Sequence, residues 1–131
     1  MKTVYVASRT AIKEDVKKIY SELKKIGYSS PYDWTNHKNI KPYSENSKLA
    51  EEYAIEDIKG AKESDLFIII TDEAGTGMHT ELGVAIGNYL EFNKPLIYAV
   101  GEHTNRSIFF FHPAVKRRAT IEEVLKELKD L

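Results

Sequence analysis

An almost entirely apolar run in the middle of the chain, Leu66 to Thr71, most constrains how this sequence can fold. Such a run, without polar alternation, is typical of a central parallel strand that helices cover on both faces. It leads into a glycine turn at Gly75 and Gly77, and then into a helical pattern from about His79 to Phe92. Ligands of α/β proteins bind at turns of this kind, at the carboxyl end of the sheet.

Strand and helix patterns alternate through the rest of the sequence, and the only other apolar stretch is a short piece at Ser107 to His112. Alternation of this kind implies parallel strands joined by right-handed crossovers. We therefore expect one domain, residues 1–131, with a three-layer α/β/α sandwich and a mostly parallel, Rossmann-like (flavodoxin-like) sheet of about five strands. The other strands are predicted at Thr3 to Ala7, within Tyr28 to Trp34 and at Pro95 to Val100, and the other helices over Ile12 to Ile26, from near Ser47 and over Thr120 to Leu131.

Composition excludes several classes of partner. The formal net charge of −1 leaves no basic excess for a nucleic acid polymer. The longest apolar run is too short to cross a bilayer, so we expect no membrane partner. With no cysteine and no metal-ligand spacing among the four histidines, we expect neither a disulfide nor a metal site. The first residues lack the layout of a signal peptide, and we expect a cytoplasmic protein.

Glu81 lies where the pattern predicts the first turn of the helix after the glycine turn. The helix dipole would favour its ionised form, and an ionised carboxylate can be a nucleophile or can stabilise a cation. An ordinary helix-start glutamate has the same position. The turn matches only part of the dinucleotide-binding fingerprint, because Thr80 replaces its third glycine. The sequence His79-Thr80-Glu81 imitates a zinc deaminase motif, which we reject because the chain has no cysteine ligands.

Asp57 is predicted near the end of the second helix, where the dipole tends to raise the pKa of a carboxyl group. Such an acid can hold a proton for a leaving group, although a solvated helix acid would fit the same position. In the next helix, Gly83 and Gly87 each cost about 1 kcal/mol relative to alanine. This cost indicates close approach of another helix, either within the fold or across a homodimer axis.

Together these positions resemble the nucleoside 2-deoxyribosyltransferase family and the related 2′-deoxynucleoside 5′-monophosphate N-glycosidases. The opening strand carries Tyr5, and Asp57 precedes the strand-opening Asp65 by eight residues. The glycine turn continues as Thr-Glu81-Leu-Gly, in the pattern that holds the family's nucleophile. The likeness runs from Thr3 to about Val100 and includes Asn93-Lys94-Pro95.

The resemblance implies cleavage of the N-glycosidic bond of a 2′-deoxynucleoside or its 5′-monophosphate. Glu81 would attack C1′ and form a glycosyl-enzyme ester, as retaining glycosidases do. Asp57 would protonate or hold the departing base, and Tyr5 would orient Glu81. Water as acceptor would give hydrolysis, and a second base would give transfer. The family likeness implies no cofactor, a small-molecule nucleoside or nucleotide as partner, and a homodimer.

Further residues are candidates for binding the substrate. An arginine fork suits a phosphate, and anions collect at helix starts. The candidates are Ser8, Arg9 and Thr10 for a 5′-phosphate, Arg106 and Ser107 as second candidates that reach a neighbouring subunit's site, Gly75 and Gly77 for a phosphate or ribose, and Trp34 with Tyr5 as walls that crowd a 2′-hydroxyl.

Two other functions stay open. One is a non-catalytic nucleotide-binding or sensing module on the same fold, and the other is an N-glycosidase that acts on another ribosyl compound.

Overall fold

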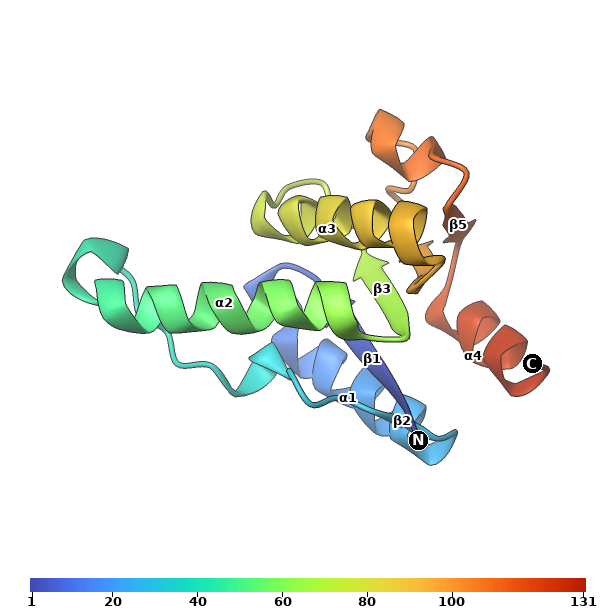
Figure 1. Cartoon of the computed structure of the whole chain (residues 1–131), viewed down its shortest axis with the longest axis horizontal. Coiled ribbons are helices and arrows are strands. Elements are labelled where there is room, and N and C mark those ends of the chain that lie inside the picture. The colour runs from blue at the N-terminus through green and yellow to red at the C-terminus, as the bar shows by residue number, and fades with distance from the viewer.

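Five parallel strands form one sheet in the order β2-β1-β3-β4-β5 (Figure 1). The computed structural model describes residues 1–131. The strands are β1 (Lys2–Ala7), β2 (Tyr28–Ser29), β3 (Leu66–Ile70), β4 (Leu96–Val100) and β5 (Val115–Arg118), and the α-helices are α1 (Lys13–Lys25), α2 (Ser47–Glu63), α3 (Gly77–Phe92) and α4 (Ile121–Lys129).

The helices cover both faces of the sheet, with α2 and α3 side by side on one face and α1 and α4 on the other (Figure 1). This arrangement confirms the predicted three-layer α/β fold of the Rossmann-like type, and its strand order is that of the doubly wound flavodoxin-like sheets. No helix has the length and apolar character needed to cross a membrane.

The core lies around β3, whose first four side chains, Leu66 to Ile69, are fully buried. The strand is central, between β1 and β4, and helices cover both faces of the sheet, which explains why the strand is apolar on both faces. Gly27 follows α1 with a φ of +97°, a conformation that glycine adopts without strain. The sequence therefore predicted the centre of the sheet and the end of α1 correctly.

One prediction about an element is wrong, and the sequence did not place the fifth strand. Helix α3 begins at Gly77, two residues before the expected start at His79, so Glu81 lies beyond its first turn. The apolar piece Ser107–His112 contributes a short 3-10 helix, Ile108–Phe111, while the fifth strand is β5. That strand carries two arginines and a lysine at the edge of the sheet, where charged side chains discourage pairing with another chain.

The two helical glycines of α3 do not meet another helix within the fold. A Cβ atom added at Gly83 or Gly87 would find no heavy atom within 4 Å. Close helix packing inside the chain is therefore not the reason for these glycines. The homodimer alternative stays a prediction, and Leu90 and Phe92, both more than half exposed, lie on the same helix.

The carboxyl half of β1 is open on the side of β2, because β2 pairs only with Lys2 and Thr3. Two side chains bind the free backbone groups of Val6 there. The amide of Val6 donates to the Tyr20 hydroxyl at 2.9 Å, and the Trp34 indole Nε1 donates to the Val6 carbonyl oxygen at 2.6 Å. These bonds satisfy the strand's buried polar groups and fix Trp34 beside the end of β1.

Candidate active site

Tyr5, Asp57 and Glu81 come from β1, α2 and α3 and line one cavity of about 670 Å³ at the carboxyl end of the sheet. The Tyr5 hydroxyl donates a hydrogen bond to Glu81 Oε2. The structure thus brings together the three residues that the sequence predicted as catalytic, although 76 positions separate Tyr5 from Glu81 in the chain. Paired acids and a phenol in one concave site are groups suited to acid–base and nucleophilic chemistry.

Packing fixes the position of the Tyr5 ring. The side chain is 1% exposed and stacks on Phe67, with ring centroids 6.1 Å apart. Gly60 of α2 lies against the other side, where an added Cβ would stand 2.3 Å from Tyr5 Cδ2. Glycine is required at this position because only a residue without a side chain lets the helix approach the ring so closely.

Burial raises the pKa of Glu81 to about 8. The hydrogen bond from Tyr5 acts in the opposite direction, and the charge of Asp57 raises the pKa of Glu81 further. The expectation that the helix dipole keeps Glu81 ionised is wrong, because Glu81 lies past the first turn of α3 and its burial is the larger effect. Burial and the charge of the nearby Asp57 together therefore favour the protonated form of Glu81.

Asp57 also has a raised pKa, and burial is again the main cause, while the neighbouring His37 lowers it. The residue lies within α2, six positions before its last residue, Glu63, so desolvation rather than the helix end explains the direction. Its Oδ1 atom is buried and accepts no hydrogen bond. A buried carboxyl oxygen without a partner is available to a ligand in the cavity.

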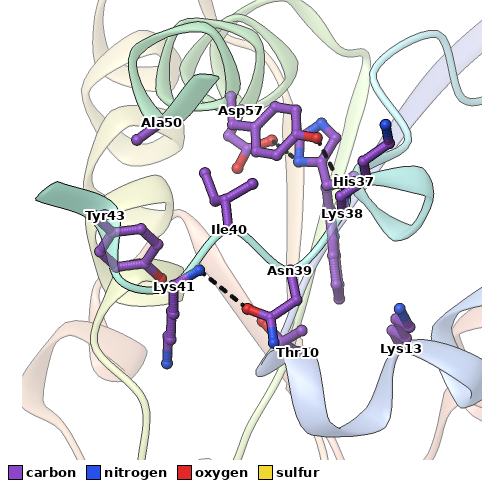
Figure 2. A pocket seen from close by; sticks show the side chains of 12 residues that line it. Thr10, Lys13, His37, Lys38, Asn39, Ile40, Lys41, Tyr43, Ala50 and Asp57 are labelled. Carbon is purple, nitrogen blue, oxygen red and sulfur yellow. Dashed lines mark hydrogen bonds and ion pairs between the residues drawn. The ribbon is translucent and has the colours of Figure 1, made fainter. Parts of the chain in front are cut away.

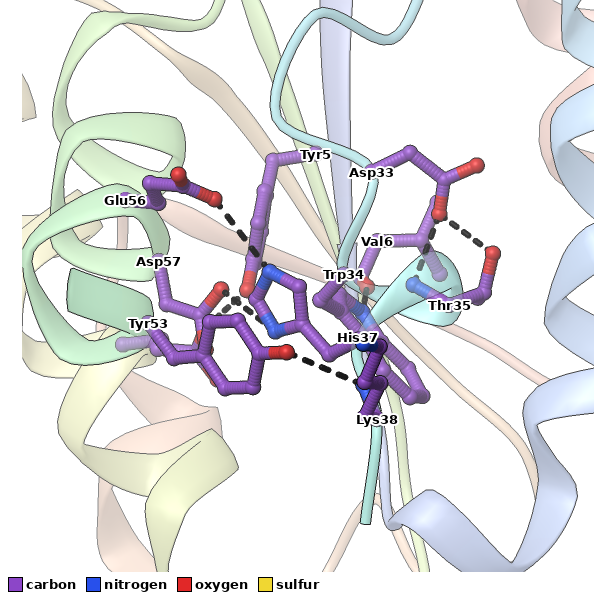
Figure 3. Close-up of polar contacts among 11 residues, drawn as sticks. Tyr5, Val6, Asp33, Trp34, Thr35, His37, Lys38, Tyr53, Glu56 and Asp57 are labelled. Carbon is purple, nitrogen blue, oxygen red and sulfur yellow. Dashed lines mark hydrogen bonds and ion pairs between the residues drawn. The ribbon is translucent and has the colours of Figure 1, made fainter. Parts of the chain in front are cut away.

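His37 lies beside Asp57 and was missed as a site residue by the sequence analysis. Its ring stacks on Tyr53 with centroids 3.8 Å apart, its Nε2 lies 3.3 Å from Glu56 Oε2, and its Nδ1 lies 4.0 Å from Asp57 Oδ1 (Figure 3). These contacts hold the loop after Trp34 against α2. No sequence signal marks His37, because its partners lie more than a dozen positions further along the chain.

The glycine turn lies at the cavity as predicted, with both Gly75 and Gly77 among its lining residues. Gly75 has a φ of +101°, and an added Cβ would lie 2.9 Å from Met78 Cε. The turn therefore needs glycine for its backbone conformation, because the flexible Met78 side chain could move away from an added Cβ. Because Gly77 is the first residue of α3, the start of a helix faces the cavity, a position that favours anions.

The segment after β1 also lines the cavity with Ser8, Arg9 and Thr10. Arg9 Nη1 lies 3.1 Å from Asp72 Oδ1, so a carboxylate already partly neutralises its charge. The Ser8 hydroxyl donates to the Arg9 carbonyl oxygen at 2.9 Å. The candidate phosphate-binding residues are thus in place, but Arg9 does not present a free guanidinium.

Arg106 and Ser107 do not line this cavity. Arg106 Nη1 donates to the Asp72 carbonyl oxygen at 3.0 Å, and Ser107 Oγ accepts from the Phe109 amide at 3.2 Å, which caps the short 3-10 helix. Both have local structural contacts within the chain. Their predicted reach into a neighbouring subunit's site stays a prediction.

The long polar loop before α2 contributes Lys41 and Tyr43 to the lining of the cavity. Loops of this length often bind ligands, yet nothing in the sequence singles out these two side chains. Trp34, at the start of the same segment, lines the cavity as predicted.

Comparison of the chain with protein-family models, with curated proteins and with solved structures gives no match. The resemblance to the deoxyribosyltransferases and N-glycosidases therefore stays a prediction that is based on the residues alone.

Proposed function

We propose that this protein cleaves the N-glycosidic bond of a 2′-deoxynucleoside or of its 5′-monophosphate, with Glu81 as nucleophile. The observation that carries the proposal is the hydrogen bond from the Tyr5 hydroxyl to Glu81 beside Asp57, within one cavity. A protein that only binds nucleotides has no need of two buried acids whose pKa values are both raised.

The first step of the reaction requires Glu81 to be ionised and Asp57 to be protonated. Ionised Glu81 attacks C1′ while the C1′–N bond breaks, the bonding electron pair moves to the base nitrogen, and Asp57 supplies the proton. Because the charge of Asp57 raises the pKa of Glu81, ionising either acid favours the protonated form of the other. One shared proton therefore gives the nucleophile and the acid that the first step needs.

The second step releases the sugar from Glu81. Water attacking C1′ of the glycosyl ester gives the free sugar, and a second base gives a new nucleoside; Asp57 takes the acceptor's proton in either case. Throughout, the Tyr5 hydroxyl holds one oxygen of Glu81, leaving the other free for C1′. The turn at Gly75 and the Ser8–Thr10 segment line the same cavity, and in this proposal they contact the sugar or a 5′-phosphate.

Replacing Glu81 with alanine is expected to abolish base release, because it removes the attacking oxygen. The protein is incubated with each member of a panel of 2′-deoxynucleosides and their 5′-monophosphates, with and without a second free base. Chromatography then measures the base that is released. New nucleoside in the presence of added base identifies a transferase, and sugar release alone identifies a hydrolase.

Ribonucleosides and a dinucleotide in the same panel test for another ribosyl substrate. Glu91→Ala, at an exposed position further along the same helix, is the matched control and is expected to keep activity. Equal base release by wild type and Glu81→Ala would contradict the proposal. No turnover of any substrate by either protein would favour the alternative of a non-catalytic nucleotide-binding module.

A further inference from the structure

A second cavity, of about 430 Å³, adjoins the first one (Figure 2). Asp57 lines both cavities, whereas Tyr5 and Glu81 line only the first. The two cavities therefore form one continuous cleft with Asp57 at the boundary between them. The residues common to both are Thr10, Trp34, Lys41, Tyr43 and Asp57.

Because Asp57 lies at the boundary, the two parts of a substrate would occupy different cavities. This step rests on the proposed function, in which Glu81 bonds to C1′ and Asp57 reaches the base nitrogen. The sugar must then lie in the first cavity against Glu81, and the leaving base must extend past Asp57 toward the second. The second cavity is thus placed to be the leaving-group subsite.

The walls of the second cavity suit a flat ring. Trp34, Ile40 and Ala50 supply apolar surface, and the stacked rings of His37 and Tyr53 supply flat surface beside it. Ligand sites generally combine such walls with a few polar groups that set specificity. Here three of those polar groups are lysines.

Three lysines line the second cavity: Lys13 from α1, and Lys38 and Lys41 from the loop before α2, which are spaced around it in Figure 2. None of the three forms an ion pair with a carboxylate, in contrast to Arg9. Asp57 is the one carboxylate among the lining residues. The cavity is therefore a local concentration of positive charge on a chain whose formal net charge is −1.

We propose that the second cavity binds the leaving base and selects a base that carries a negative charge, of the class of heteroaromatic carboxylates. A neutral base would leave the lysine charges without a counterion. A ring carboxylate would face the flexible lysine side chains while its ring packs on the aromatic walls. The substrate class is then a deoxynucleoside or deoxynucleotide of an acidic base, rather than of a neutral one.

The test is a titration of the protein with free bases, followed by NMR at neutral pH and low salt. Nicotinate and nicotinamide form a matched pair, because they share ring and size and differ in charge. We expect nicotinate to bind about tenfold more tightly than nicotinamide. The combined variant Lys13→Gln, Lys38→Gln, Lys41→Gln is expected to remove this preference.

A control variant with the same change of charge is Lys24→Gln, Lys126→Gln, Lys129→Gln, at exposed positions that line neither cavity. It is expected to keep the preference for nicotinate. Equal binding of the two bases, or a preference that survives in the cavity variant, would overturn the proposal.

Inorganic phosphate is titrated in the same way. Binding of phosphate that depends on the three lysines, with nicotinate and nicotinamide bound alike, would also overturn the proposal, because it would place a substrate phosphate at these lysines. Failure of the proposed function would instead appear as the absence of Glu81-dependent base release, which is measured separately and does not alter these titrations.

Discussion

Replacing Gly60 with alanine is expected to lower Glu81-dependent base release by about a hundredfold. The added Cβ would stand 2.3 Å from Tyr5 Cδ2 and 2.7 Å from Cε2, so the ring must move. The Tyr5 hydroxyl would then lose its hydrogen bond to Glu81, and the nucleophile its orientation. The rate of release by Gly60→Ala, compared with wild type at saturating substrate, measures this effect.

Gly87→Ala is the matched control for that substitution. It introduces the same methyl group in a neighbouring helix, where nothing lies within 4 Å of the new atom. Activity should be unchanged, and stability should rise by up to about 1 kcal/mol because alanine favours the helix. Unfolding in denaturant shows whether Gly60→Ala remains folded. A folded Gly60→Ala protein with wild-type release would contradict the positioning role of Tyr5.

A second large effect concerns the dependence of stability on pH. In the folded protein burial raises the pKa of Glu81 from 4.5 to about 8. Between these values the native state keeps a proton that the unfolded state releases, so the free energy of unfolding falls as pH rises. The decrease attributable to Glu81 is expected to be roughly 3 to 5 kcal/mol between pH 4.5 and 8.

Glu81→Gln is expected to remove most of this decrease in the free energy of unfolding, since the amide does not titrate. Unfolding in urea at a series of pH values measures the free energy for both proteins. Asp57, whose pKa is also raised, contributes the remaining slope in the same direction. Glu127→Gln serves as the control. The pKa of Glu127 is lowered by its hydrogen bonds with Arg118, so its contribution to stability stays constant at neutral pH and is lost only as the pH falls below the unfolded value of 4.5. An unchanged slope in Glu81→Gln would show that Glu81 is not a buried, protonated acid.

The strongly patterned parts of the fold followed from the sequence. The apolar run of β3, the periodic faces of the helices and the alternation of elements were enough to predict a parallel sheet between two helix layers. β5 could not be predicted, because Val-Lys-Arg-Arg has the composition of a polar surface segment and becomes a strand only by pairing with β4. The start of α3 was misplaced since glycine at its first position is a poor helix signal.

The candidate site likewise contains residues that could be predicted from the sequence and residues that could not. The family resemblance, and not the pattern of elements, implied that Tyr5, Asp57 and Glu81 act together, and in the structure all three line one cavity. His37 and Lys41 lie on an irregular loop, and only tertiary contacts such as the stacking of His37 on Tyr53 place them. The upward shift of the Glu81 pKa results from burial by several elements, and the position of Glu81 in its own helix does not reveal that burial.

The most direct test of the central claim is to look for the sugar on Glu81. Wild-type protein is mixed with a 2′-deoxynucleoside substrate identified in the panel, quenched in acid within the first turnover and analysed by mass spectrometry, intact and after digestion. We expect a deoxyribosyl ester on the peptide that contains Glu81, and none in Glu81→Gln. Base release in the wild type without such an ester, or an ester on another residue, would contradict Glu81 as the nucleophile.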